Sequence, residues 1–474
     1  MSFLQRRKSL DVEQSIGSGA RLRQTLSWPH LVALGVGAII GTGIYTLVGI
    51  GAGYAGPAVI LSFLIAGAIC ACAALCYAEM ATLMPVAGSS YTYTYAVAGE
   101  FPAWIVGWSL ILEYTVVCAA VAVGWSGYAA GFLRSIGVDL PTELLQGPYI
   151  EGGLFNLPAA LIVFAVAGLL LVGSRESTTV SGVLVAVKVI ALGIFMFIAF
   201  KAFQSSNFTP FMPYGFPKVG EGAETHGVMA AAAIIFFAFY GFDAVSTAAE
   251  ETRNPGRDLV RGIVGSMAVC TVIYIAVAAA ALGAVPFKDF AASPEPLAHV
   301  LRTLGSPFAA SLISVAAIVA LPTVILSFLY GQSRIFFVMA RDGLLPAKLG
   351  SVSERTGTPA TMTVVTAIVV SVIAGIFPLT DIAALANAGT LIAFIAVACC
   401  VMALRVTQPD RPRVFRTPMV WLVGIVAVLG CLYLFFSLQN KTRNYFYIWN
   451  VIGIAAYFLY AVHASHIGKA RRGS

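Results

Sequence analysis

The chain has 474 residues, of which 59% are hydrophobic and only 10% are charged, and its mean hydropathy is +0.89. Soluble domains carry about 25% charged residues, so this composition excludes an ordinary soluble protein. It predicts an all-α integral membrane protein that lies in a lipid bilayer. The net charge of +7 is spread along the chain without the basic cluster that nucleic acids require, so we expect no nucleic-acid partner.

Apolar runs long enough to cross a ~30 Å hydrocarbon core recur along nearly the whole chain. We predict twelve transmembrane helices, at 28–53, 58–84, 104–132, 156–173, 178–203, 227–250, 260–285, 307–340, 361–377, 382–404, 417–438 and 444–465. No soluble domain of useful size remains between them. The first run is too long and begins too late to be a cleavable signal peptide.

The distribution of basic residues predicts the orientation of these helices. With the N-terminus inside, 20 of the 28 Lys and Arg residues fall in inner segments and 7 in outer ones, which leaves Lys188 alone within a span. Cytoplasmic loops carry such an excess of positive charge. We therefore expect a multi-pass protein of the plasma (inner) membrane with both termini in the cytoplasm.

Two of the predicted helices are interrupted near their centres. The first breaks at Gly41-Thr42-Gly43, and the sixth breaks between Tyr240 and Asp243. Because the breaks are five helices apart, they favour two inverted five-helix repeats over a division into six and six, and paired interruptions mark the binding site of a secondary transporter. The predicted organisation is a tail (1–27), a first repeat (28–203), a second repeat (204–404), two further helices (405–466) and a second tail (467–474).

The break in the first helix offers backbone groups to a ligand. It should free the N–H groups of Thr42, Gly43 and Ile44 and the carbonyls of Ile39 and Ile40. N-termini of helices attract anions and C-termini attract cations, so a zwitterion could satisfy both sets. The alternative is that the small residues merely allow close helix packing.

Three ionisable residues lie deep within predicted helices. Lys188 and Glu113 are about 15 Å into the fifth and third spans at ~1.5 Å per residue, and Asp243 flanks the second break. Intramembrane charges are functional by default, and burial disfavours the charged form of Lys188, so a proton could leave and return. The alternative is an internal ion pair or hydrogen bond. Glu79, near the end of the second span, is expected to face the membrane interface instead. The polar, Tyr-rich segment 85–100 that follows is expected to form a short interfacial helix.

Six segments in order resemble the amino acid–polyamine–organocation superfamily, and within it the bacterial relatives of the cationic amino acid transporters. These segments are GAIIGTGIY (37–45), LILEY (110–114), VAVKVIAL around Lys188, TPFMPYGF (209–216), FYGFDAVSTAAEETRNPGRD (239–258) and YGQSRIFFVMARDGLLP (330–346). The resemblance implies the APC/LeuT-type fold, with five-plus-five inverted repeats and broken helices 1 and 6. It also implies an amino acid bound between those helices beneath the gating aromatic Phe237. Lys188 matches a lysine that replaces a sodium ion in proton-coupled members, with expected contacts to the first helix and to Thr323 of the eighth.

These observations predict a proton-coupled symporter that imports L-amino acids, with arginine, lysine or ornithine favoured and small neutral substrates accepted. An amino acid/polyamine exchanger without net proton coupling is the alternative. The eight cysteines lie in apolar runs without metal or disulfide spacing, and we found no catalytic motif. We therefore expect neither an enzyme nor a metal cofactor nor a sodium requirement, and leave open a small regulatory membrane subunit.

Overall fold

The fold is known from a computed structural model, which describes residues 6–9, 26–85, 88–172, 178–221, 224–247, 249, 252–346, 349 and 360–470. Within these ranges the regular elements are helices, and the only strand-like pairings are two isolated bridges, Leu26 with Thr252 and Val219 with His226. Most of the predicted tail 1–27 and residues 471–474 lie outside the described part of the chain.

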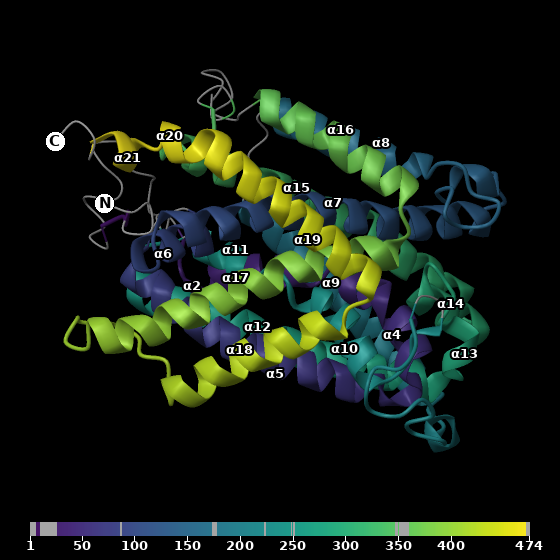
Figure 1. Cartoon of the computed structure of the whole chain (residues 1–474). Helices are drawn as coiled ribbons and strands as arrows, with labels where there is room; N and C mark the ends of the chain where they lie inside the picture. Colours follow the sequence, from purple (N-terminus) through teal and green to yellow (C-terminus); the bar gives the residue numbers. More distant parts are fainter. Residues whose placement is uncertain are drawn as a thin grey trace.

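The helices follow the predicted apolar runs closely, and Figure 1 shows them bundled side by side. In the first half of the chain they are α2 (Trp28–Ile39), α3 (Thr42–Tyr45), α4 (Leu47–Ala55), α5 (Val59–Leu83), α6 (Ser89–Val97), α7 (Glu100–Ser135), α8 (Leu157–Val172), α9 (Thr178–Lys201), α10 (Val228–Ile235) and α11 (Phe242–Thr247). In the second half they are α12 (Pro255–Ala284), α13 (Phe287–Phe290), α14 (Pro296–Thr303), α15 (Pro307–Arg341), α16 (Ala360–Ile376), α17 (Leu379–Thr407), α18 (Val420–Ser437), α19 (Asn440–Ala456), α20 (Val462–Ala464) and α21 (His466–Ala470). Short 3₁₀ helices lie at Gly56–Ala58, Thr142–Leu144, Ser205–Phe208 and Phe236–Phe239, and a π-helical turn lies at Tyr457–Ala461.

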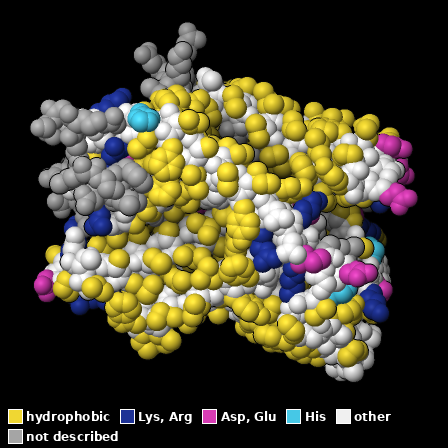
Figure 2. All heavy atoms as spheres, viewed as in Figure 1, with side chains coloured by type: hydrophobic (Ala, Val, Ile, Leu, Met, Phe, Trp, Pro, Cys, Tyr) yellow, Lys and Arg dark blue, Asp and Glu magenta, His cyan; other side chains and the backbone are white. Residues whose placement is uncertain are grey.

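Eight helical stretches in the described residues are long and apolar enough to cross a membrane. Four shorter apolar helices accompany them: α2, α8, the Val228–Phe239 stretch and α16. Hydrophobic side chains cover most of the surface seen in Figure 2, with charged side chains gathered mainly toward its two ends. Such a surface fits an all-helical membrane protein.

The two ends of the bundle can be distinguished through α7. Its first residue, Glu100, accepts hydrogen bonds from Arg6 at 2.9 Å and from Ser465, so both ends of the described chain meet there. At ~1.5 Å per residue, the 36 residues of α7 carry it about 50 Å to the opposite end of the bundle. We call these the terminal end and the far end; the hairpin of α13 and α14 lies at the far end (Figure 1).

Two local predictions need correction. Glu79 does not face the interface, because it is fully buried and its carboxylate binds Arg405 through contacts of 2.6 and 3.1 Å and the Thr417 N–H at 2.7 Å. The polar segment 85–100, expected as an interfacial helix, does contain helix α6, but the side chains of α6 pack inward. In both cases tertiary partners satisfy polar groups that an isolated helix would present to water.

Candidate functional site

Both predicted interruptions are present, and they pack directly against each other. α2 ends at Ile39 and the chain restarts as α3 at Thr42, while the sixth helix is broken by an extended Tyr240 and by Gly241 at φ 107°. A Cβ at Gly43 would lie 2.3 Å from the Ala238 Cα, and one at Gly241 would lie 2.7 Å from the Ala38 carbonyl carbon. Glycine is therefore required at both positions for the two broken helices to touch.

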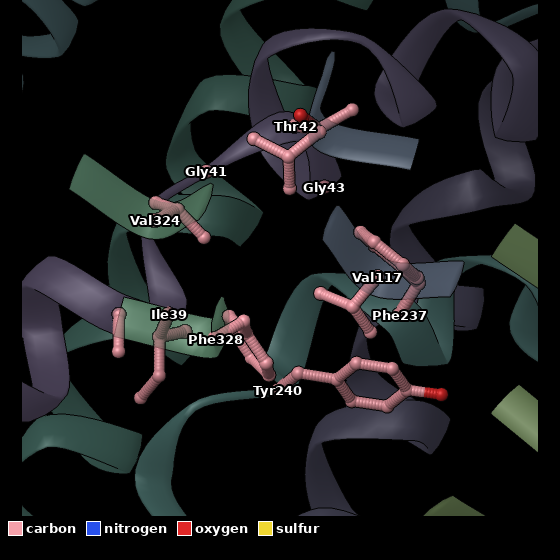
Figure 3. Close-up of a pocket in the computed structure, with 11 residues that line it drawn as sticks. Ile39, Gly41, Thr42, Gly43, Val117, Phe237, Tyr240, Val324 and Phe328 are labelled. Carbon is pink, nitrogen blue, oxygen red and sulfur yellow. The ribbon is translucent and has the colours of Figure 1, made fainter. Parts of the chain in front are cut away.

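A small cavity of about 10 Å³ lies at this contact. A space of that size holds about one water molecule, so the surrounding side chains must move apart to admit a larger ligand. Its lining comes from four helices: Ala38, Ile39, Gly41, Thr42 and Gly43 of the first break, Val117 and Val121 of α7, Phe237 and Tyr240 of the second break, and Val324 and Phe328 of α15. In Figure 3 these side chains surround a central space, with Thr42 at one side of it.

The backbone at the start of α3 has unused hydrogen-bond donors. The N–H groups of Thr42 and Gly43 find no acceptor among the described residues, whereas the Ile44 N–H donates to the Gly41 carbonyl at 3.2 Å. The prediction of a free N–H was therefore wrong for Ile44. The Thr42 hydroxyl is fully buried and likewise has no partner in the described part of the chain. These three donors at the cavity wall would suit a carboxylate.

The end of α2 is capped by side chains from other helices. A helix leaves its last four carbonyls without intrahelical partners, and here Gly37 O accepts from Lys188 Nζ at 2.8 Å while Ile39 O accepts from the Tyr274 hydroxyl at 2.7 Å. The prediction of a free carbonyl was therefore wrong for Ile39. The Ile40 carbonyl, by contrast, accepts no hydrogen bond from any described residue.

Lys188 is almost fully buried, with 1% of its surface exposed. Besides Gly37 it reaches Thr323 Oγ1 at 3.4 Å, so it touches both the first and the eighth predicted spans, as the resemblance implied. It does not line the cavity. Its ammonium lies against the negative end of the α2 dipole, which favours a cation there.

Glu113 and Asp243 form a second buried group beyond the cavity wall. They lie close enough for their charges to interact, and Asp243 accepts hydrogen bonds from the Tyr114 hydroxyl at 3.4 Å and the Gly241 N–H at 3.3 Å. Neither carboxylate lines the cavity. Asp243 therefore helps to hold the second break, and both carboxylates are separated from the ligand space by other residues.

The aromatic residues of the second break have different roles. Phe237 and Tyr240 lie with ring centroids 5.1 Å apart, and the Tyr240 hydroxyl points away from the cavity in Figure 3. That hydroxyl donates to Asn387 Oδ1, and Asn387 Nδ2 donates in turn to Ala233 O at 2.6 Å and Ile234 O. Asn387 thus fixes the end of α10 and Tyr240 together.

Sequence reasoning missed Asn387 and five wall residues. Asn387 carried a signal, because a polar amide within an apolar span requires partners. The five wall residues carried no such signal, since apolar residues are expected throughout these helices; they are Ala38, Val117, Val121, Val324 and Phe328.

A sequence model of the amino acid permease family matches residues 26–463. The chain is 43% identical to a branched-chain amino acid permease of Bacillus subtilis, over 98% of this chain and 99% of that protein. It is 39% identical to a methylthioribose transporter of the same species, over 99% of this chain and 100% of the relative. It is also 39% identical to cationic amino acid transporter 2 of Arabidopsis thaliana, over 86% of this chain and 64% of that protein.

Proposed function

The chain belongs to the amino acid permease family, a family of transporters and not of enzymes, and we propose that it is a proton-coupled symporter that imports a small L-amino acid by alternating access. The observation that carries this proposal is the set of unused donors at the cavity. The N–H groups of Thr42 and Gly43 and the Thr42 hydroxyl are buried without described partners. Buried polar groups are normally paired, so a ligand carboxylate is their natural acceptor.

The ammonium group of the ligand would take the other side of the break. The Ile40 carbonyl lies at the C-terminal end of α2, where the helix dipole favours a cation. With the carboxylate at the start of α3, both charged ends of a zwitterion are satisfied by one interrupted helix. Phe237 and Tyr240 line the cavity from the second break and would cover the ligand.

The walls of the cavity favour an apolar side chain on the ligand. The residues contributed by α7 and α15 are Val117, Val121, Val324 and Phe328, and no charged side chain of the described residues lines the cavity. A cationic side chain would leave its charge unpaired there, which is costly in low dielectric. Neutral aliphatic amino acids are therefore the preferred substrates, in keeping with the name of the branched-chain permease relative.

Arginine, lysine and ornithine form the second candidate class. The buried carboxylates of Glu113 and Asp243 and the cationic relative support it. A rearrangement that exposes either carboxylate to the cavity would be needed to pair a cationic side chain.

For coupling we propose that a proton takes the place of sodium and that Lys188 holds it. Protonated Lys188 would keep α2 attached to α9 and α15 through Gly37 and Thr323, and loss of the proton would weaken that attachment. Glu113 is the second proposed participant. From the excess of basic residues in the inner segments we propose that both termini lie in the cytoplasm, in which case the far end would face outward. Exchange without net proton coupling is the alternative.

One experiment tests these points together. Purified protein in proteoliposomes is given radiolabelled valine or arginine under an imposed pH gradient, a sodium gradient or neither. We expect uptake of valine driven by the pH gradient alone. Uptake driven by sodium would refute the proton proposal, exclusive uptake of arginine would refute the apolar assignment, and counterflow without gradient-driven accumulation would indicate an exchanger. Unlabelled methylthioribose serves as a competitor, because one relative carries that name.

A further inference from the structure

Three glycines on one side of α7 are each in close contact with a different residue from elsewhere in the chain. Gly124 contacts the side chain of Thr42, and a Cβ there would lie 2.5 Å from its Cγ2. Gly127 contacts the backbone of Pro294, with a Cβ placed 2.9 Å from its carbonyl oxygen. Such distances are too short for any real Cβ, so a side chain at these positions would displace the partner.

Gly131, one turn further along α7, is in close contact with a charged side chain. A Cβ there would lie about 2 Å from all three atoms of the Glu295 carboxyl group. Glu295 has 4% of its surface exposed, pairs with Arg302 of α14 and accepts from the Ser314 hydroxyl of α15 at 3.4 Å. The carboxylate cannot move aside without losing these partners, although its side chain is flexible.

These contacts continue outward from the cavity as successive layers. Thr42 lines the cavity, and one turn beyond it the Tyr128 hydroxyl donates to the Tyr45 carbonyl at 2.5 Å with the two rings edge to face. Gly124 and Gly131 are seven residues apart, so the layers extend about 10 Å along α7 toward the far end. The first two layers join α3 to α7, and the outer one joins the α13–α14 hairpin to α7.

The same hairpin also rests on the outer half of the first helix. A Cβ at Gly49 of α4 would lie 3.0 Å from Pro296 and 3.1 Å from the Phe290 carbonyl oxygen. The hairpin therefore bridges α4 and α7 at the far end.

We propose that Gly124, Gly127 and Gly131 form a seat on α7, here called the glycine seat, on which the α3–α4 segment and the α13–α14 hairpin close. A bare helix surface lets these partners approach closely enough to shut the far end over the cavity. Opening to that side separates Thr42, Pro294 and Glu295 from the seat. The inference rests on the proposed transport function for its purpose, but the closure itself is a property of the protein without ligand.

The test uses a reporter thiol in the cavity, on the inner side of the closed far end. Val121→Cys places a thiol on the cavity wall, and its reaction with a membrane-impermeant thiol reagent is measured on full-length protein in intact cells. The same protein without this substitution supplies the background from the eight native cysteines. Gly127→Ala should raise the labelling rate at least about fivefold, because Pro294 meets it with rigid backbone. The matched control is Gly193→Ala on α9, where a Cβ would meet nothing within 4 Å.

A double-variant comparison separates a specific clash from general damage. In the Glu295→Ala background the carboxyl group that Gly131→Ala would strike is gone, so adding Gly131→Ala should change labelling less than twofold. In the Glu295→Gln background the clash remains, so the same addition should still accelerate labelling. If Gly131→Ala alone fails to accumulate in the membrane, recovery of the protein by Glu295→Ala supports the seat.

Three results would overturn the proposal. They are labelling of Gly127→Ala equal to that of Gly193→Ala, an equal effect of Gly131→Ala in both Glu295 backgrounds, and failure of Gly131→Ala to accumulate with no recovery by Glu295→Ala. Labelling needs neither substrate nor coupling ion. A sodium-driven or arginine-specific transporter would thus refute the proposed function and leave the glycine seat intact.

Discussion

Replacing Lys188 by methionine should uncouple transport from the proton gradient. The substitution keeps an unbranched apolar stem of similar length and removes the ammonium that donates to Gly37 O at 2.8 Å and to Thr323 Oγ1 at 3.4 Å. A hydrogen bond from a charged group contributes about 1.5–3 kcal/mol, and the longer contact to Thr323 adds less. Since 1.4 kcal/mol is tenfold in an equilibrium constant, the attachment of α2 should weaken by roughly 10- to 150-fold.

The assay compares two kinds of transport in the same proteoliposomes. Accumulation driven by a pH gradient should fall at least about tenfold in Lys188→Met, while counterflow at equal pH should persist, because the cavity itself does not include Lys188. Thr323→Val should give a milder loss. The matched control is Lys201→Met, which changes an exposed lysine at the end of the same helix. Undiminished gradient-driven accumulation in Lys188→Met would refute the coupling role.

Three further predictions concern other parts of the molecule. Glu79→Gln should lower the free energy of unfolding by about 3 kcal/mol, since removing one partner of a buried ion pair is costly; the Tm in detergent measures it, with the exposed Glu143→Gln as control. Val324→Ala removes two methyl groups from the cavity wall, so binding of valine should weaken by about 1.5 kcal/mol, or roughly tenfold; calorimetry measures it, and unchanged affinity would contradict the assigned wall. Burial raises the pKa of the Glu295 carboxyl despite its arginine neighbours, so the closed hairpin binds a proton more tightly than an open, hydrated one. The closed state therefore gains stability as the external pH falls toward the closed-state pKa and loses it as the pH rises through that pKa. Labelling of the Val121→Cys thiol should slow as the external pH is lowered, and this dependence should vanish in Glu295→Gln.

The last of these predictions depends on every charged or titratable group that acts on Glu295. Arg302 of α14 pairs with it directly, and Arg134 and Tyr128 of α7 interact with it electrostatically. Glu295→Gln removes the carboxyl group and leaves these neighbours in place, which makes it the decisive comparison.

The sequence by itself determined the features that depend on local composition. Long apolar runs predict helices in a bilayer because only paired backbone is tolerated there, and the glycines at 41, 43 and 241 predicted where two of these helices break. Lys188 was also visible, since a charge deep in an apolar run needs partners wherever the helix lies. Each of these signals is carried by a residue that differs from its neighbours in the chain.

Only the tertiary structure decided which surfaces meet. Val117 and Val324 form the cavity wall, yet they look like any other valine in an apolar span, because the hydrophobic effect that buries them is non-directional. Glu79 was predicted to face the membrane interface. In the structure it is enclosed by Arg405 and Thr417, which lie more than 300 residues away in the chain. The need for glycine at 127 and 131 likewise depends on Pro294 and Glu295. Contacts between distant segments are set by how the helices pack, and no local pattern of residues records that packing.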